Sequence, residues 1–340
     1  MIQLAVGRLQ LAVFFICQLQ TTNYWKMAIL LTHKYNGMYF TSLPDHNKPG
    51  FDEQLHFSSF KKHNIIFNAL TDSSHCEDHV GCLSFKTVLS GEEWYGINNH
   101  RIAVRPGQFL ILNNAQTYSS SIDTVGKVKS LSIFFRKDFA SSVFFDKLSD
   151  EGISLDNPFY NDGPVPEFFQ TLNYTDPGLL KQLSDLIFSL DEQGYSSNLV
   201  DEHLVGVLQH LISIHRTESK RTMDVNAVKS STRTEIYKRL CIAKDFMHSC
   251  FTDNLDLQAI SNEACLSVPQ LVRQFKIVFR ATPHQYLTRI RLEYAAGLLK
   301  HTTTPIHEIT WKCGFENMSA FCRAFKAEYN VQPHNFRIMS

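Results

Sequence analysis

The last hundred residues of this 340-residue chain repeat one pattern at an offset of fifty positions. Eight matched positions within 16 residues constrain the fold, because both copies must adopt the same local structure. Two copies are too few for a solenoid, which needs three or more stacked repeats, so they predict a tandem pair of small helical units. The first copy is Leu271, Arg273, Phe275, Lys276, Phe279, Pro283, His284 and Tyr286, and the second is Phe321, Arg323, Phe325, Lys326, Tyr329, Pro333, His334 and Phe336.

Charge is divided unevenly along the chain, although its formal net charge is zero. Residues 233–340 hold 14 Lys and Arg against 9 Asp and Glu, whereas the rest of the chain holds 19 against 24. The difference in net charge between the two regions is more informative about binding partners than the net charge of the whole chain. The region that carries the repeat is basic, which favours an anionic partner such as nucleic acid.

Length and composition indicate a globular protein of two or three domains, with 44% hydrophobic residues for packed cores. The eight cysteines contain no CxxC pair, and several lie at apolar helix positions, which favours a reducing compartment. The chain has no Ser/His/Asp order, phosphate-binding glycine loop or dinucleotide fingerprint. We therefore expect no enzyme, no catalytic residue and no cofactor.

Residues 1–26 form an N-terminal extension that can be interpreted in three ways. Leu9 to Cys17, preceded by Arg8, resembles the short apolar core of a signal peptide, but it is too short to span a membrane. No clean small-residue cleavage site follows it. The alternatives are that translation begins at Met27, which we favour, or that the stretch is an ordinary extension.

The region from 62 to 136 has the sequence pattern of a β-domain, in which short runs of β-branched and aromatic residues are separated by residues that favour turns. Such spacing predicts a sandwich or a small barrel. Asn98-Asn99 is expected to form a tight hairpin, because Asn tolerates the left-handed conformation. Val125-Gly126 is expected to be another turn. The expected strands are 65–67, 82–89, 94–97, 101–104, 109–112 and 128–135.

Helical spacing replaces this pattern from about 137 to 215. Asp176-Pro177 predicts a helix start, and the apolar residues beyond it indicate two amphipathic helices over 176–215. We assign this segment to dimerisation. Residues 216–232 are polar and aperiodic, which is typical of an interdomain linker.

The C-terminal domain, 233–340, is predicted to hold two helix-turn-helix units. The first covers about 255–279, with Ser267 as the N-cap of its second helix, and the second covers about 306–329. A long helix over about 284–301, opened by Thr282-Pro283, connects them.

In a helix-turn-helix unit the second helix enters the DNA major groove. Leu271 and Phe275 share a buried face, which leaves Pro269, Gln274 and their neighbours toward solvent or DNA. Trp311 and Phe315 are expected in the core. The candidates for base contact are Gln270, Arg273, Met318, Ser319 and Arg323, and the candidates for phosphate contact are Lys276, Lys326, His284 and His334.

This region of about 100 residues resembles the AraC-type transcription regulators. The resemblance implies two helix-turn-helix units that read successive major-groove segments about 34 Å apart from one chain. The residues that carry it are Arg291-Leu292-Glu293, Ala295-Ala296, Leu298-Leu299, Ile309, Gly314-Phe315, Ser319, Phe321, Arg323, Phe325-Lys326, Pro333 and Phe336-Arg337.

Three positions depart from the family pattern. The family has glycine where Arg280 and Asn330 stand, just past each recognition helix. Asn330 accepts a left-handed C-cap, whereas Arg280 is expected to distort the end of the first unit. Pro269 donates no hydrogen bond where a base contact is expected, so the second unit is the better candidate for specificity.

The β-rich region, 27–175, resembles more weakly the cupin-like effector domain of such regulators, through Gly91, Tyr95-Gly96-Ile97, Arg105-Pro106-Gly107 and Phe109 to Leu112. The histidines that hold a metal in enzymatic cupins are absent, so no metal is expected. The loop-like stretch His75 to His79 is a weak metal candidate. Glu92-Glu93 with Trp94 lines an effector pocket or, as we favour, a solvated hairpin edge.

These observations predict an α+β multidomain chain, with a cupin-like β-barrel and helical extension followed by an all-α double helix-turn-helix. We expect a cytoplasmic bacterial transcription regulator with a small-molecule effector whose binding residues are unknown. The expected partners are double-stranded promoter DNA, a second copy of the chain and RNA polymerase, with no membrane. Two alternatives stay open: a barrel used only for dimerisation and, more remotely, a cupin-type metalloenzyme.

Overall fold

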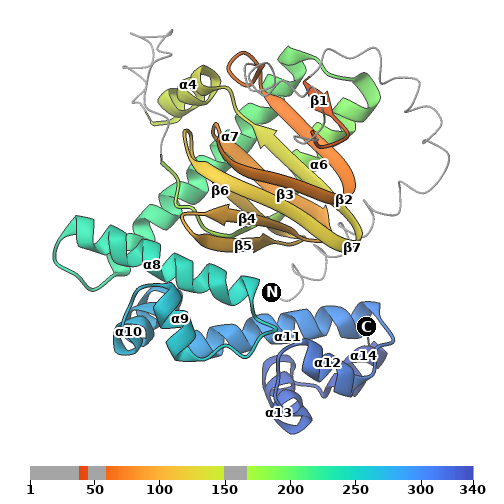
Figure 1. The fold of residues 1–340 in the computed structure, drawn as a ribbon, viewed down its shortest axis with the longest axis vertical. Coiled ribbons are helices and arrows are strands. Elements are labelled where there is room, and N and C mark those ends of the chain that lie inside the picture. Colours follow the sequence, from red (N-terminus) through yellow and green to blue (C-terminus); the bar gives the residue numbers. More distant parts are fainter. Residues whose placement is uncertain (1–37, 45–58, 149–166, 340) are drawn as a thin grey trace. The chain divides into compact units, whose positions relative to one another are not determined.

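The computed structural model of the chain describes residues 38–44, 59–148 and 167–339. The chain divides into two compact units, Met1–Thr217 and Glu218–Ser340. The first is built on a sheet with helices, and the described part of the second is helical (Figure 1). The predicted fold class is confirmed. The N-terminal extension of residues 1–26 lies outside the described residues. No described helix combines the length and apolar character that a membrane span requires.

The first unit contains an eight-stranded sheet with the strand order β1-β2-β7-β3-β6-β8, and the β4–β5 hairpin pairs with β7. Neighbouring strands are antiparallel apart from β1 and β2. The strands are β1 Tyr39–Phe40, β2 Ile65–Val80, β3 Ser84–Ser90, β4 Glu93–Ile97, β5 His100–Val104, β6 Gln108–Leu112, β7 Thr117–Phe134 and β8 Asn173–Tyr174.

Strands β2 and β7 are far longer than the runs predicted for them. Their pairing is irregular between Thr71 opposite Val128 and Ser73 opposite Asp123. Val125-Gly126 therefore lies in an irregular stretch within β7, and the turn predicted there is wrong. The polar second half of β2 and the polar first half of β7 carry a weak β signal, but each strand supplies the other's backbone hydrogen bonds, so pairing overrides local preference.

The β4–β5 hairpin confirms the tight turn predicted at Asn98-Asn99. Both asparagines have positive φ, 49° and 66°, as a two-residue hairpin of the primed type requires. Ile97 and His100 face each other across the turn. The hairpin brings Glu93, at the start of β4, beside β7.

Three helices, α4 (Lys137–Leu148), α6 (Pro177–Gln193) and α7 (Ser197–Arg221), pack on one face of the sheet (Figure 1). Asp176 caps α6, as predicted, by accepting hydrogen bonds from the amides of Gly178 and Leu179. The apolar stripes of α6 and α7 join the sheet residues in one core. Its members include Leu179, Leu183, Leu186, Leu190, Leu204, Val207, Leu208 and Leu211 with Phe85, Phe109, Leu131 and Ile133.

The predicted linker is partly helical. Helix α7 continues to Arg221 and α8 begins at Ser230, so the aperiodic polar stretch expected over 216–232 is shorter. Extending an existing helix needs no new nucleus, so its last turns need no apolar face of their own.

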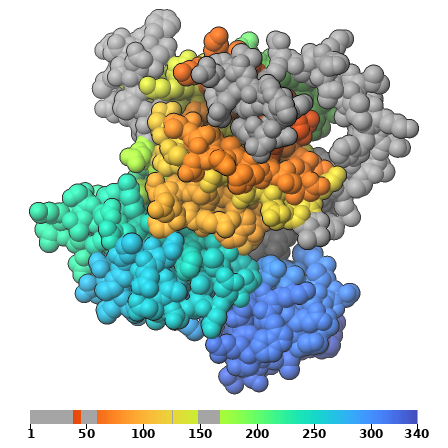
Figure 2. Space-filling model, in the orientation of Figure 1, coloured from red at the N-terminus to blue at the C-terminus, as the bar shows by residue number. Residues whose placement is uncertain are grey.

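The second unit is a set of helices in which α11 connects two halves. Figure 2 shows the second half, in darker blue, as a lobe beside the first. Thr282 opens α11 with a capping box that includes Gln285. The helices are α8 Ser230–Ser249, α9 Leu257–Glu263, α10 Val268–Phe279, α11 Pro283–His301, α12 Ile306–Lys312, α13 Met318–Tyr329 and α14 Pro333–Met339.

Candidate nucleic-acid interface

Helices α9 and α10 form the first helix-turn-helix unit. The Ser267 hydroxyl accepts a hydrogen bond from the Gln270 amide and caps α10, as the sequence predicts. The sequence predicts the turn at Cys265-Leu266-Ser267, and Cys265 adopts it with a positive φ of 50°. Its amide donates to Asn262, and the next amide, of Leu266, donates to Ser261.

Helices α12 and α13 form the second unit with the same local geometry. Gly314 takes the left-handed position and Asn317 caps α13 by accepting from the Ala320 amide. Gly314 corresponds to Cys265, an offset of 49, whereas the caps Asn317 and Ser267 are offset by 50. The turn of the second unit is therefore one residue longer.

The aromatic residues of the repeat build the same small core in both units. Phe275 lies 4.5 Å from Phe279 and 5.3 Å from Tyr286, measured between ring centroids. The corresponding distances from Phe325 to Tyr329 and Phe336 are 4.6 and 5.2 Å. Each triple joins the end of a recognition helix to the helix that follows it, which fixes the direction of the recognition helix.

The outward positions of α10 and α13 carry matching cations. Arg273 and Arg323 are exposed, as are Lys276 and Lys326 three residues further on, so each pair lies on one side of its helix. None of the four side chains makes a hydrogen bond or ion pair with another described residue. Their charged groups are therefore available to an external anion.

The other predicted contact residues are also accessible. At the start of α13, Met318 is 51% exposed and Ser319 is exposed. In α10, Gln270 is half-buried. His284 and His334 are exposed in the first turns of α11 and α14, each directly after a proline.

Three expectations about this region are wrong. Gln274 does not face outward: it is 1% exposed, and its amide accepts from the Asn226 N–H and donates to the Asn226 carbonyl, both at 3.1 Å. Trp311 is not in the core, because α12 leaves it 56% exposed. Arg280 does not distort its unit, since it adopts the left-handed C-cap (φ 58°) that Asn330 adopts in the second unit (φ 61°).

Arg291, one of the residues that carry the family resemblance, has an internal role. Its Nε donates to the Phe251 carbonyl at 2.8 Å and its Nη2 donates to the Asp253 carbonyl at 2.8 Å. It also lies 3.0 Å from the position that a side-chain carbon on Gly314 would take. This arginine joins α11 to the loop after α8 and is not part of the outward basic face.

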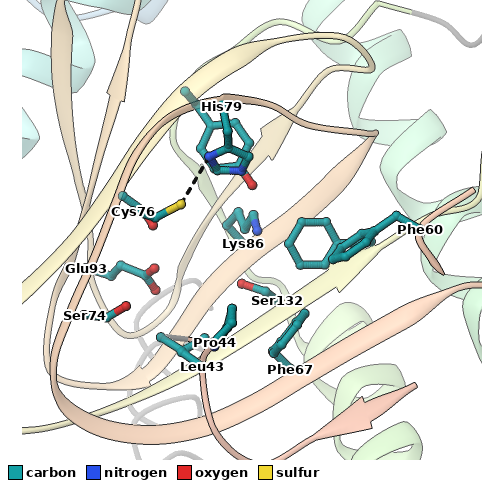
Figure 3. A pocket seen from close by; sticks show the side chains of 13 residues that line it. Leu43, Pro44, Phe60, Phe67, Ser74, Cys76, His79, Lys86, Glu93 and Ser132 are labelled. Atoms are coloured by element: carbon teal, nitrogen blue, oxygen red, sulfur yellow. Dashed lines mark hydrogen bonds between the residues drawn. The ribbon is translucent and has the colours of Figure 1, made fainter. Parts of the chain in front are cut away.

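A second candidate site lies in the first unit, where a cavity opens on the sheet (Figure 3). Glu93 lines it and is 4% exposed, so the solvated hairpin edge favoured for this residue is wrong. The stretch His75 to His79 is part of β2 and not a loop, and an irregularity in its pairing with β7 lies between Cys76 and His79. The described residues contain no group of three or more metal-ligating side chains.

Known proteins match this chain mainly at its C-terminus. A family model for a helix-turn-helix domain matches residues 260–338. The HTH-type transcriptional activator RhaS of Escherichia coli strain CFT073 is 26% identical over 182 residues, which cover 53% of this chain and 60% of RhaS. The match thus spans about three fifths of that relative.

Two solved structures are also similar to parts of this chain. The C-terminal domain of AraT, a response regulator from Geobacillus stearothermophilus, is 30% identical and covers 30% of this chain and 85% of that domain, with a TM-score of 0.29. Apo ToxT from Vibrio cholerae is 14% identical, covers 82% of this chain and 98% of ToxT, and has a TM-score of 0.32.

Two capped helices on a shared connecting helix, each with an exposed arginine at the same place, define a double helix-turn-helix domain. The C-terminal unit is such a domain, and in sequence it is similar to the helix-turn-helix family and to the transcriptional activator RhaS.

Proposed function

We propose that this chain binds specific promoter sequences in double-stranded DNA through α10 and α13. The observation that carries the proposal is the equivalence of Arg273 and Arg323, both exposed and without an internal partner. A guanidinium donates two parallel hydrogen bonds to guanine, so it reads sequence in the major groove. Lys276 and Lys326 lie further along the same faces and contact phosphate.

The remaining contacts follow from the same helix faces. Gln270, Met318 and Ser319 meet base edges beside the arginines. His284 and His334 lie in the first turns of two helices, where backbone amides and the helix dipole favour a phosphate. With one recognition helix in each half, the domain spans two successive turns of the major groove, about 34 Å apart.

The first unit is proposed to bind a small-molecule effector that controls DNA binding. Support comes from its cavity, whose lining mixes charged, hydroxyl and aromatic side chains. The alternative, a unit used only for dimerisation, draws on Phe188 of α6, which is 67% exposed. Homodimerisation, contact with RNA polymerase and a cytoplasmic location belong to the proposal. Stoichiometric iron or zinc in the purified protein would instead favour the remote alternative, a cupin-type metalloenzyme.

The DNA-binding proposal is tested with duplexes selected from a random pool and a salt titration of their affinity. The parent should bind the selected site in the nanomolar range, and its affinity should fall steeply with salt. Lys326→Ala should weaken selected and random duplexes alike and reduce the salt slope by about one. Lys181→Ala, which removes an exposed charge from α6, is the matched control. Failure to enrich any sequence would contradict sequence-specific binding.

A further inference from the structure

The cavity of the first unit, about 60 Å³ in volume, holds a charged group that no described residue neutralises with a hydrogen bond or ion pair. Lys86 lies in the middle of strand β3 on the face opposite the helices, and Figure 3 shows its amine within the cavity, between Glu93 and Phe60. The lining comes from the segment after β1, the turn before β2, and β2, β3, β4 and β7. Its residues are Leu43, Pro44, Phe60, Phe67, Ser74, Cys76, His79, Lys86, Glu93, Tyr118, Ser120, Ser132 and Phe134.

The Lys86 side chain is 3% exposed and makes no hydrogen bond or ion pair within 4.0 Å in the described part of the chain. Its Nζ lies over two aromatic rings, 3.6 Å from the centre of Phe134 and 5.4 Å from that of Tyr118. Aromatic faces attract a cation, but they do not replace the hydrogen-bond acceptors that a buried ammonium loses with water.

The other titratable groups around Lys86 do not complete its neutralisation. The Glu93 carboxylate accepts a hydrogen bond from the Ser130 hydroxyl at 2.7 Å, and burial raises the pKa of Glu93. Cys76 Sγ lies 3.2 Å from His79 Nδ1, so these two side chains are occupied with each other. Cys82 is held in its thiol form, because burial raises its pKa to about 11. Burial lowers the pKa of Lys86 to about 8, despite the favourable charge of Glu93.

The wall of the cavity beside Lys86 is aromatic. Phe67 and Phe134 meet with ring centroids 5.7 Å apart, and Phe60 meets Phe134 at 4.8 Å. All three belong to one cluster of buried residues. Rings in edge-to-face contact offer both faces and edges to a further planar apolar group. The site thus places an unpaired cation beside an apolar, aromatic surface.

We propose that this cavity binds a small organic carboxylate with an aromatic body. The Lys86 ammonium donates to the carboxylate, and the body of the ligand packs against Phe60, Phe67 and Phe134. Ser132, whose hydroxyl also lines the cavity, is a second polar contact. The inference rests on the proposed function only in treating this ligand as the effector.

The test measures binding to the full-length protein, without DNA, by calorimetry and thermal melting. The probes are benzoate, its neutral counterpart benzamide, and acetate, which has the charge without the body. Benzoate should bind and raise the melting temperature. Benzamide should bind at least about tenfold more weakly because it loses the charge-assisted contact, and acetate at least about tenfold more weakly because it lacks the aromatic body. A parent protein that binds benzoate no better than benzamide, or does not bind it, overturns the proposal.

Variants assign the contact to Lys86. Lys86→Met should weaken benzoate at least about tenfold, and it should raise the melting temperature of the ligand-free protein, because a buried unpaired charge is removed. Lys129→Met is the control, since that amine already donates to the Asn68 carbonyl at 3.0 Å. Unchanged binding by Lys86→Met, or a lower melting temperature without ligand, overturns the proposal.

Glu93→Gln separates the two charges of the cavity. Measured at a pH well below the pKa of Lys86, so that its amine stays protonated without Glu93, the variant should bind benzoate at least as tightly as the parent, because it removes a negative group from the same cavity. Weaker binding would assign the ligand to Glu93 and contradict the proposal. Affinity of the same preparations for selected DNA is measured separately, so loss of the carboxylate site and loss of the DNA-binding function give different results.

Discussion

The two helix-turn-helix units share their cores, caps and outward cations but differ in how each recognition helix is held. In the first, Gln274 of α10 is buried against the backbone of Asn226, and Arg280 at the helix end forms a 3.3 Å ion pair with Asp224. In the second, the positions of Gln274 and Arg280 are occupied by Ala324 and Asn330.

The two recognition helices are therefore held in place by different contacts. Helix α10 is joined to residues 224–226, the short segment that follows α7, so its position depends on that connection. Helix α13 is held within its own half of the unit: besides its aromatic core, the Tyr329 hydroxyl donates to the Leu292 carbonyl at 3.5 Å and Glu328 forms a 3.9 Å ion pair with Arg289 of α11. We infer that α13 is the more constant reader of bases, and that α10 is the helix through which the connection can influence DNA binding.

The largest expected effect concerns the turn of the second unit. A side-chain carbon at Gly314 would lie 2.7 Å from the Phe251 carbonyl oxygen and 2.9 Å from that of Thr252, at a φ of +76°. Gly314→Ala should lower the free energy of unfolding by about 3 kcal/mol. Gly297→Ala, on α11 with open space around it, should instead stabilise by about 0.5–1 kcal/mol. Urea unfolding measures both, and equal effects would contradict the steric argument.

The next effect compares the two arginines. Arg323→Ala should cost about 1–3 kcal/mol of DNA-binding free energy and relax the preference at one base pair. Arg273→Ala should relax specificity less, because its neighbour Pro269 donates no hydrogen bond. Binding to single-base variants of the selected site measures the difference, with Arg101→Ala on the first unit as the control. An Arg323→Ala protein that binds every site as well as the parent would show that no base is read there.

A smaller effect tests the anchor of α10. Gln274→Ala makes the first unit like the second and leaves the Asn226 N–H and carbonyl without partners, which should cost about 1–2 kcal/mol of stability. Gln270→Ala, on the accessible side of the same helix, should change stability by less than about 0.5 kcal/mol. Equal losses in urea unfolding would mean that the bonds to Asn226 are not an anchor.

The smallest effect concerns the helix ends. Arg280→Gly relieves a left-handed non-glycine residue and gives up an exposed ion pair, so a net gain of about 0.5 kcal/mol is expected. Asn330→Gly should gain less, because asparagine tolerates this conformation. Thermal unfolding of both variants checks the order, and a larger gain at Asn330 would reverse it.

Helical repeats were predictable because their signals are local. Ser267 and Thr282-Pro283 cap helices through contacts three residues away, and the phenylalanines of the repeat show their buried face by spacing alone. The outward position of Arg273 and Arg323 follows from the same spacing. Gln274 was misplaced because its partner, Asn226, is 48 positions away.

The sheet was harder to predict for the same reason. The polar halves of β2 and β7 become strands only because each finds the other, and the burial of Glu93 depends on β7 lying beside β4. The burial of Lys86 could not be predicted from the sequence, because a single lysine in an apolar run usually lies at the protein surface. The cavity around it is made from six separate segments.

By itself, the sequence determined the double helix-turn-helix, its caps and the two arginines that face outward, because helix faces are set by spacing along one segment. Only the tertiary structure decided which polar residues are buried. Gln274 makes its hydrogen bonds inside the protein, whereas the Lys86 amine, within a cavity, has no hydrogen-bond or ion-pair partner among the described residues. Burial depends on which distant segments contact each other, and a local sequence pattern does not predict those contacts.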